Sequence, residues 1–360
     1  MSESETKKIE ELKQKVMNTL TPPNEPEIKN GSELPIPKEG MEEKVGFLNC
    51  HLFEGTTMST FYKKIVFEDE ERAKKIINYI LNSNTEVFML AEVWSSTLKE
   101  LIIQGVRSKY KYSYYPKNGK LFKLDSGLVY LSKKKILKSN YINYKNLSSW
   151  DKGSTKCISY IITEDAMAYM CTHLDAGDNI CRKANLVQLF ELFDELEKQC
   201  IKKIILAGDL NVAENDFNDV VNITKTENDT EKLMNGFNLK SDEYKYLVDE
   251  MDKRGMHDAL RIIYKNILDK PCISSDHYFN SLACLWSSAK DRSRSRLDYF
   301  FVKGIDVCDS GMYFNWWAGK DFDNKDSISN CFENVNDGPL NNIFPVSDHY
   351  GIWLLFKDTS

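Results

Sequence analysis

Polar residues able to do hydrolytic chemistry stand at the ends of short apolar segments in this sequence. Near the C-terminus, Ser347-Asp348-His349 comes just before the apolar run 351–356, which predicts a carboxylate and an imidazole side by side at a strand edge. Rigid strand edges commonly hold catalytic groups. The triplet alone is equally typical of a strand end with an ordinary surface histidine, so the rest of the chain must decide.

The same arrangement recurs along the chain. The residues that follow or fall within a predicted strand in this way are Asn49, Glu92, His173, Asp209, Asn211 and Asp298. Each of them alone could be a turn former, a helix-start carboxylate or a surface side chain. Taken together, they predict one polar cluster at one edge of a sheet.

The chemistry that such a cluster supports is hydrolysis of a phosphate ester. Hard oxygen ligands without cysteine, and with few histidines, suit Mg²⁺, which binds through one or two carboxylates and keeps several waters. We therefore predict that Glu92 and Asn49, together with Asp348, hold Mg²⁺, for which Mn²⁺ or Co²⁺ could substitute.

The remaining polar residues suggest how the ester would be attacked. Asp298 and His349 predict a general base whose tautomer is fixed by a carboxylate. His173, Asp209 and Asn211 would hold the phosphoryl oxygens and the attacking water where charge develops. The chain has no serine or cysteine nucleophile motif, so direct attack by water is the simpler mechanism.

Composition limits the partners and the compartment. The chain has 360 residues, a net charge of -6 and nine cysteines without paired spacing. The acidic balance argues against broad attraction to nucleic acid or to an anionic membrane, although a local basic patch stays open. The cysteines are typical of reduced thiols, and no apolar run approaches the ~18 residues of a membrane span. We therefore expect a cytoplasmic protein that could also bind membranes peripherally.

Hydrophobic spacing outlines the domains. Residues 1–40 predict a short amphipathic helix over 6–20 followed by a proline-rich linker, and residues 41–360 predict a single catalytic domain. The predicted strands cover 45–48, 87–91, 127–131, 157–162, 167–172, 204–207, 296–302 and 351–356, and the predicted helices cover 69–81 and 181–198. Residues 213–285 read as an insertion with helices near 244–251 and 257–267.

The motifs resemble those of the endonuclease/exonuclease/phosphatase superfamily. In chain order they are Asn49, Leu90-Ala91-Glu92-Val93, Thr172-His173-Leu174, Gly208-Asp209-Leu210-Asn211, Arg296-Leu297-Asp298-Tyr299 and Ser347-Asp348-His349. The resemblance runs over about residues 44–356. It implies an α+β fold, a four-layered α/β/β/α sandwich, with Mg²⁺-dependent cleavage at one end.

Within that superfamily, the chain is most similar to the neutral sphingomyelinases. The similar segments are Glu92-Val93-Trp94, Asp125-Ser126-Gly127, Lys152-Gly153 and the stretch 172–176. The resemblance implies hydrolysis of sphingomyelin, or a related phosphocholine lipid, to ceramide and phosphocholine, with Lys152 and Asp125 on the substrate side. The chain departs from that branch at Asp175, where the family has Gln, and at Ser126, where it has Gly.

Two alternatives remain. Segments 208–213 and 296–300 also resemble the abasic-site endonucleases, but Val93 and Trp94 replace the Thr and Lys of those enzymes. The acidic charge is also unfavourable for DNA. A catalytically silent binding module would be expected to have lost some of the polar residues, and none is missing.

An aromatic cluster late in the chain bears on lipid contact. Residues 313–317 contain four aromatics, including Trp316 and Trp317. Tyrosine and tryptophan favour a membrane interface, where one side is apolar and the other wet. The same cluster could equally pack in the core, so membrane docking by Trp316 and Trp317 is a hypothesis.

Overall fold

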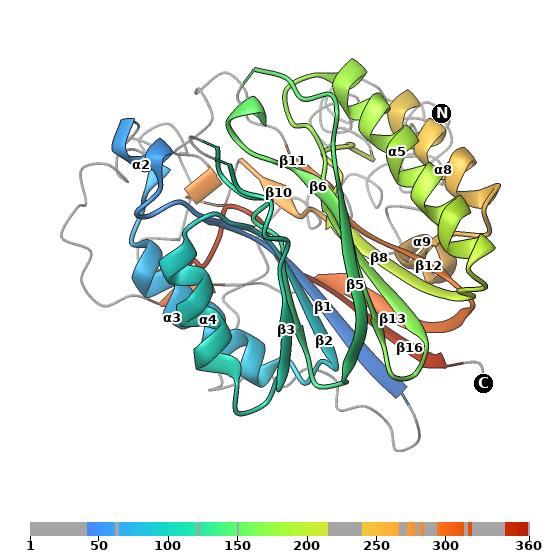
Figure 1. Cartoon of the computed structure of the whole chain (residues 1–360), viewed down its shortest axis with the longest axis horizontal. Helices are drawn as coiled ribbons and strands as arrows, with labels where there is room; N and C mark the ends of the chain where they lie inside the picture. Colours follow the sequence, from blue (N-terminus) through green and yellow to red (C-terminus); the bar gives the residue numbers. More distant parts are fainter. Residues whose placement is uncertain are drawn as a thin grey trace, which may run out of the picture.

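Two six-stranded sheets pack against each other, and helices cover their outer faces (Figure 1). The computed structural model describes residues 42–61, 65–120, 123–149, 151–214, 240–265, 272–277, 280, 282–283, 294–312, 316–318 and 343–358. The predicted N-terminal helix and linker, and most of the predicted insertion, lie outside these residues. Within the described part, the predicted four-layered α/β/β/α sandwich is confirmed.

The first sheet contains both ends of the described chain. Its order is β13-β16-β1-β2-β4-β3, and within it β1 and β2 run parallel while the other neighbours are antiparallel. Its strands are β1 (Glu42–Leu52), β2 (Val87–Val93), β3 (Tyr112–Tyr114), β4 (Val129–Ser132), β13 (Ile305–Met312) and β16 (Ile352–Asp358). The sequence-distant β1 and β16 are therefore hydrogen-bonded neighbours.

The second sheet has the order β5-β6-β7-β8-β12-β9. Only its pair β7 and β8 is parallel. Its strands are β5 (Ile136–Asn143), β6 (Cys157–Thr163), β7 (Met167–His173), β8 (Lys203–Asp209), β9 (His257–Asp258) and β12 (Asp298–Lys303). Two short hairpin-like pairs complete the strands: β10 (Ser275–Asp276) with β11 (Arg294–Ser295), and β14 (Trp316–Ala318) with β15 (Ile343–Pro345).

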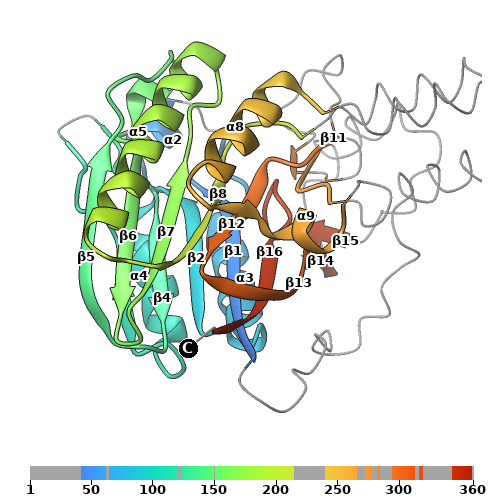
Figure 2. The same ribbon diagram turned by 90° about the vertical axis from the view of Figure 1, so that its right-hand side faces the viewer.

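Helices cover the outer face of each sheet. Figures 1 and 2 show α3 (Asp69–Asn82) and α4 (Ser96–Val106) on the first sheet, and α5 (Asn179–Lys198) and α8 (Asp242–Asp252) on the second. The short elements are α2 (Thr57–Phe61), α9 (Ala259–Ile263) and the 3-10 turn η2 (Asp151–Gly153). None of the helices in the described ranges is long and apolar enough to cross a membrane.

Burial on both faces of the central strands explains their continuous apolar sequence. In β1, Val45 and Phe47 belong to the core between the sheets, whereas Leu48 and Cys50 belong to the core under α3 and α4. A third core lies under α5 and α8 and contains Leu186 and Phe190 of α5. Three apolar layers therefore hold the four structural layers together.

Several elements were absent from the sequence prediction, among them the four edge strands of the two sheets, β3, β5, β9 and β13. β5 is largely exposed and β13 is partly exposed, so neither carries an apolar run. The predicted strands at 296–302 and 351–356 correspond to β12 and β16, and the unpredicted β13 lies between them in the chain and pairs with β16. Helix α4 was missed as well, although the side chain of Ser95 accepts the Leu98 N–H and caps it. The predicted helices near 244–251 and 257–267 correspond to α8 and to α9 in the described part.

Gly208 offers a direct test of how closely β7 and β8 approach beside the predicted catalytic residues. A Cβ at Gly208 would lie 2.3 Å from the carbonyl oxygen of Thr172, and this backbone atom is held in the sheet. We expect Gly208→Ala to lower the free energy of unfolding by ~1–3 kcal/mol, as overpacking does. The measurement is thermal unfolding, with Gly119→Ala as the control, because its Cβ would meet ordinary contacts at 3.4 Å or more. Equal melting temperatures for the two variants would contradict the prediction.

Candidate active site

Strand pairing places three of the predicted residues in one row of the second sheet. His173 on β7 is the register partner of Asp209 on β8, and Asp209 is the register partner of Asp298 on β12. Side chains of directly opposite residues lie on the same side of a sheet. The predicted gathering of polar residues at one edge is therefore confirmed for His173, Asp209 and Asp298.

Asn49 connects this row to the first sheet. Its side-chain Nδ2 donates to Glu92 Oε1 at 3.0 Å and to Asp209 Oδ2 at 3.0 Å. The backbone of both His51 and Glu92 has positive φ, 49° and 54°, and the β1–β2 register shifts between Asn49 and Leu52. Left-handed backbone at non-glycine residues is uncommon and costly, and it clusters at functional sites.

The donor set fits a divalent cation. Ligand atoms of Glu92, His173 and Asp209 lie within 4.8 Å of one another, and so do those of Asp209, Asp298 and His349. Asn49 is 1% exposed, and its Oδ1 has no hydrogen-bond partner. A buried, unpartnered amide oxygen beside carboxylates supplies the hard oxygen ligands that Mg²⁺ prefers. These residues could therefore hold a metal ion.

Asp298 and His349, the two residues predicted to act together as a general base, lie in contact. His349 Nδ1 lies 2.7 Å from Asp298 Oδ2, and His349 Nε2 lies 3.8 Å from Asp209 Oδ2. Burial alone would lower the pKa of His349, but the Asp298 and Asp209 carboxylates outweigh it and hold that pKa well above its ordinary value. With Nδ1–H donating to Asp298, Nε2 is the nitrogen left to accept a proton beside Asp209.

His173 contacts a lysine that the sequence analysis did not single out. Its Nε2 lies 3.0 Å from the ammonium of Lys156, which also donates to the Leu174 carbonyl and pairs with Asp151. Burial, and then the charge of Lys156, lowers the pKa of His173 to about 3. Because an ammonium only donates, Nε2 accepts in this contact and the imidazole stays neutral at neutral pH. Lys156, rather than His173, therefore brings positive charge to this side of the site.

Asp209 lies between the two histidines. Burial, followed by the charge of Asp298, raises the pKa of Asp209 to about 7. Its Oδ1 accepts the backbone N–H of Asn211 at 2.9 Å. The Asn211 side chain donates to the Leu174 carbonyl at 3.2 Å, and its φ is 51°. Asn211 thus orients Asp209 through its backbone, which adds to the predicted role of its side chain.

Asp348 reaches the cluster through a residue that the sequence did not single out. His51 Nδ1 lies 3.2 Å from Asp348 Oδ2 and 3.5 Å from Glu92 Oε2. Burial alone would lower the pKa of His51, but Asp348 and then Glu92 raise it to about 9. In return, His51 outweighs the effect of burial on Asp348 and lowers the pKa of that carboxyl to about 2. Asp348, which the sequence predicted to be a metal ligand, therefore contacts the His51 imidazole. Among the described residues, it belongs to neither of the two side-chain clusters that could hold a metal.

Arg72 fixes the backbone that carries these groups. Its guanidinium donates to the carbonyls of Cys50, His51 and Val346, and it pairs with Asp69 at 2.6 Å. Both partners are completely buried. One buried ion pair therefore ties β1 to the segment that precedes Asp348.

The two residues missed by sequence reasoning still carried weak signals. His51 lies two positions beyond Asn49, which is the spacing of one strand face. Lys156 directly precedes β6, so it is a polar residue at the start of an apolar strand rather than at its end. The strand-end criterion therefore could not find it.

The predicted substrate-side residues are not members of the polar cluster itself. Asp125 pairs with the buried Lys99, and its Oδ1 accepts the N–H of Gly127. Lys152 is exposed in η2, next to Asp151. Trp316 and Trp317 belong to β14, but their side chains lie outside the described residues, so their role stays a prediction.

The pKa of His51 predicts a pH dependence of stability in the metal-free protein. A histidine whose folded pKa is raised to about 9 stabilises the fold fully below its ordinary value of 6.5, and this contribution is lost as pH rises through 9. His51→Asn should therefore flatten the decline of melting temperature between these pH values in EDTA. The control is the exposed His257→Asn. A His51→Asn slope equal to that of the wild type would show that the histidine makes no such contribution.

The dyad predicts a shift in the pH dependence of activity. His349 accepts a proton only when it is neutral, so the rate should rise as pH increases through its raised pKa. Asp298→Asn removes the largest charge that raises this pKa. The acid limb should then move to lower pH while kcat falls by ~10²–10⁴. Rate profiles of this variant and of the exposed control Asp306→Asn test the assignment, and an unmoved acid limb would refute it.

Solved structures share the fold at low sequence identity. Sphingomyelinase C from Streptomyces griseocarneus has a TM-score of 0.61 at 15% identity, and the match covers 89% of this chain and 100% of that one. Beta toxin from Staphylococcus aureus, in a mutant form with bound magnesium ions, has a TM-score of 0.59 at 16% identity, covering 89% and 100%. D. rerio TDP2 complexed with single-strand DNA product has a TM-score of 0.52 at 14% identity, covering 88% and 99%.

A family model matches most of the sequence, although no curated protein sequence does. The model is that of the endonuclease/exonuclease/phosphatase family, and it covers residues 49–349. Its two ends coincide with Asn49 and His349, the first and last polar residues of the cluster. The chain belongs to the endonuclease/exonuclease/phosphatase family.

Proposed function

We propose that the protein is a Mg²⁺-dependent phosphodiesterase that hydrolyses sphingomyelin, or a related choline phospholipid, to ceramide and phosphocholine. The observation that carries the hydrolytic part is the His349–Asp298 pair facing Asp209, beside the Asn49 and Glu92 side chains. A base and a buried set of hard oxygen donors converge at one point. Such a site suits attack of water on phosphorus.

The reaction can be written with the residues in place. His349 Nε2 takes a proton from the attacking water, and Asp298 holds the imidazole through Nδ1. A new oxygen–phosphorus bond forms while the bond from phosphorus to the lipid oxygen breaks. That oxygen takes up a proton from solvent, and His349 releases its own proton to solvent, which returns the imidazole to its neutral form. Asp209 is placed to orient the water next to His349 Nε2. When bound, a divalent cation would offset negative charge on the phosphoryl and leaving oxygens.

The lipid part of the proposal rests on two similarities. The segment Glu92-Val93-Trp94 resembles the neutral sphingomyelinases more than the abasic-site endonucleases. Among the solved structures, sphingomyelinase C has the higher TM-score, 0.61 against 0.52 for TDP2. The nuclease stays the second candidate, because TDP2 in complex with DNA shares the fold.

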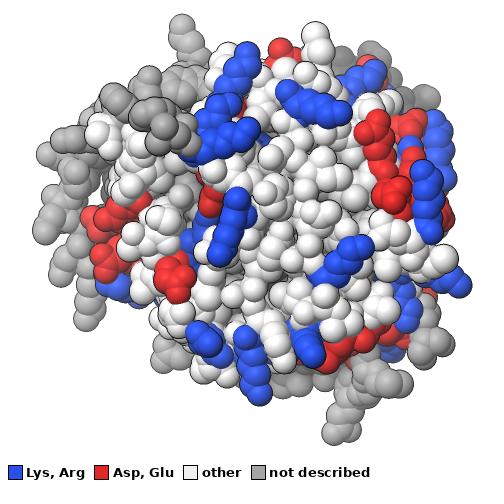
Figure 3. All heavy atoms as spheres, viewed as in Figure 1, with Lys and Arg blue, Asp and Glu red and all other residues white. Residues whose placement is uncertain are grey.

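Basic loops next to the site support contact with a phosphate-bearing lipid surface. Lys117, Lys120, Lys123 and Lys152 are exposed, and a bridge between Leu124 and Ser154 ties their loops together. Figure 3 shows one face on which basic side chains spread over the middle while acidic ones gather toward the margins. Local positive charge can draw an acidic protein to anionic headgroups. We therefore include peripheral membrane contact in the proposal.

A cytoplasmic location is also part of the proposal. The seven cysteines in the described ranges are free thiols. Free thiols are typical of a reducing compartment. A sphingomyelinase there would meet membranes from the cytoplasmic side.

A substrate panel tests the function. Purified protein should release phosphocholine from sphingomyelin vesicles in Mg²⁺, and EDTA should abolish the release. His349→Gln should lower the rate by ~10²–10⁴, whereas His257→Gln, at an exposed histidine, should not. Lysophosphatidylcholine, plasmid DNA and abasic DNA complete the panel. Cleavage of abasic DNA without phosphocholine release would replace the lipid proposal with the nuclease.

A further inference from the structure

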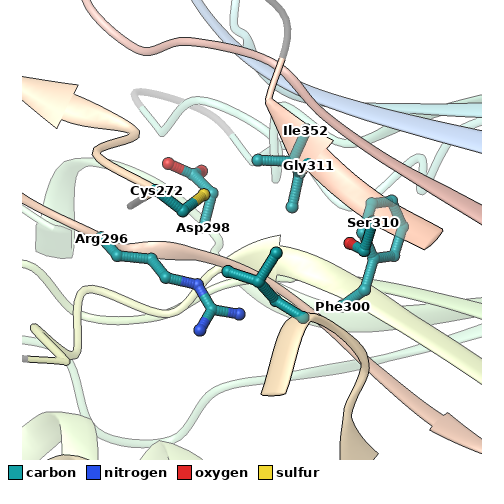
Figure 4. Close-up of a pocket in the computed structure, with 8 residues that line it drawn as sticks. Cys272, Arg296, Asp298, Phe300, Ser310, Gly311 and Ile352 are labelled. Carbon is teal, nitrogen blue, oxygen red and sulfur yellow. The ribbon is translucent and has the colours of Figure 1, made fainter. Parts of the chain in front are cut away.

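A small cavity borders the catalytic carboxylate in the protein interior. Figure 4 shows Asp298, Arg296 and Cys272 on one side and Ser310 on another, with Phe300 beside them. All five side chains are nearly buried, at 4% exposure or less. The space open to the centre of a water-sized sphere is about 10 Å³, and about that much is needed to hold one water molecule.

One oxygen of Asp298 has no partner. Oδ2 takes the hydrogen bond of His349, and the backbone N–H of Asp298 donates to Ser274 Oγ. Oδ1 is buried and receives no hydrogen bond, although the residue is only 1% exposed. Buried carboxylate oxygens are nearly always hydrogen-bonded, so this atom calls for a donor.

Arg296 lines the same cavity and has a donor without an acceptor. Its Nη1 and Nη2 are occupied by Asp258, at 2.8 and 2.6 Å, and Nη1 also reaches Glu214 at 3.2 Å. Its Nε–H is buried and makes no hydrogen bond. The residues that line the cavity therefore include one acceptor and one donor that other protein atoms leave unsatisfied.

Ser310 adds a further acceptor. Its hydroxyl hydrogen goes to the Trp353 carbonyl at 3.0 Å. A hydroxyl oxygen that donates its hydrogen keeps lone pairs for a second partner. Together with Asp298 and Arg296, Ser310 gives the cavity three polar groups, and an internal water typically makes about three hydrogen bonds.

We propose that this cavity binds one internal water molecule, which donates to Asp298 Oδ1 and so positions the carboxylate that orients His349. A cation would be repelled by Arg296 and an anion by Asp298, and an organic molecule would not fit the volume. Water both donates and accepts hydrogen bonds, so it can satisfy the acceptor of Asp298 and the donor of Arg296 together. The water would give Asp298 a second fixed point in addition to His349.

The consequence for catalysis is mechanical. A carboxylate held at one oxygen can turn about its side-chain bonds, whereas one held at both oxygens presents Oδ2 to His349 in a single geometry. The same water would link Asp298 to Arg296, and through it to Asp258 at the start of α9. The dyad would thus be braced by the ion pair between Arg296, just before β12, and Asp258 at the start of α9.

The first test is structural and needs no activity. A crystal structure that shows ordered internal waters should contain one within hydrogen-bond distance of Asp298 Oδ1 in this cavity. A structure that shows other buried waters but none here would overturn the proposal.

The second test excludes the water. Cys272→Met places a longer side chain at the cavity wall, whereas Cys272→Ala leaves the space open. We expect Cys272→Met to lower kcat on the order of 10-fold, less than losing the base itself, which costs ~10²–10⁴. KM should stay within about twofold, because the change acts on the chemical step. Cys272→Ala should keep the wild-type kcat.

The inference rests on the dyad's proposed part in hydrolysis but not on the choice of lipid. A soluble phosphodiester, bis(p-nitrophenyl) phosphate, therefore serves as substrate, and melting temperatures confirm that both variants fold. A folded Cys272→Met protein that excludes the water and keeps the wild-type kcat would refute the positioning role. If the Met variant fails to fold, the crystallographic test decides.

Discussion

The site depends on one amide that joins two sheets. Asn49 lies in β1 just before the register of β1 with β2 shifts. Its Nδ2 donates to Glu92 on the first sheet and to Asp209 on the second. Those strands belong to different sheets, whose facing sides pack largely through apolar side chains. Because the amide is 1% exposed and both acceptors are carboxylates, these bonds are charge-assisted and shielded from water. They set the distance between the carboxylates of the two sheets.

A second constraint is electrostatic. Glu92, Asp209, Asp298 and Asp348 are gathered in the interior, where like charges repel strongly. The chain offsets them with buried cationic or protonatable groups, namely Lys156, His51 and His349. Asp209 keeps a pKa of about 7 despite these partners, because burial and Asp298 dominate its surroundings. A divalent cation would neutralise the remaining negative charge here, and the unpartnered amide oxygen of Asn49 is available to bind it.

Much of the fold could be predicted because the central strands are buried on both faces. Apolar runs within Val87–Val93 and Lys203–Asp209 make these strands recognisable, and Glu92 and Asp209 near their ends mark the sheet edge. The edge strands β5 and β13 escaped prediction because exposed strands need no apolar run. Helix α4 begins directly after β2 and a capping serine, so its short apolar stripe was hidden by the neighbouring strand signal.

The candidate site was predicted where its residues follow strands, and incompletely where they do not. The dyad of Asp298 and His349 joins residues 51 positions apart, and only the order of the motifs indicated that they meet. The partnership of Lys156 with His173 depends on the pairing of β6 with β7, which no local pattern reveals. The position of His51 between Glu92 and Asp348 depends on a register shift and a positive φ in β1. These features arise from tertiary contacts, so spacing along the chain cannot show them.

The most direct test of direct water attack on phosphorus is an isotope measurement. Hydrolysis of sphingomyelin in H₂¹⁸O, followed by mass spectrometry of both products, reports which bond is broken. One ¹⁸O atom in phosphocholine and none in ceramide is the predicted result. Label in ceramide, or unlabelled phosphocholine after a single turnover, would contradict the mechanism.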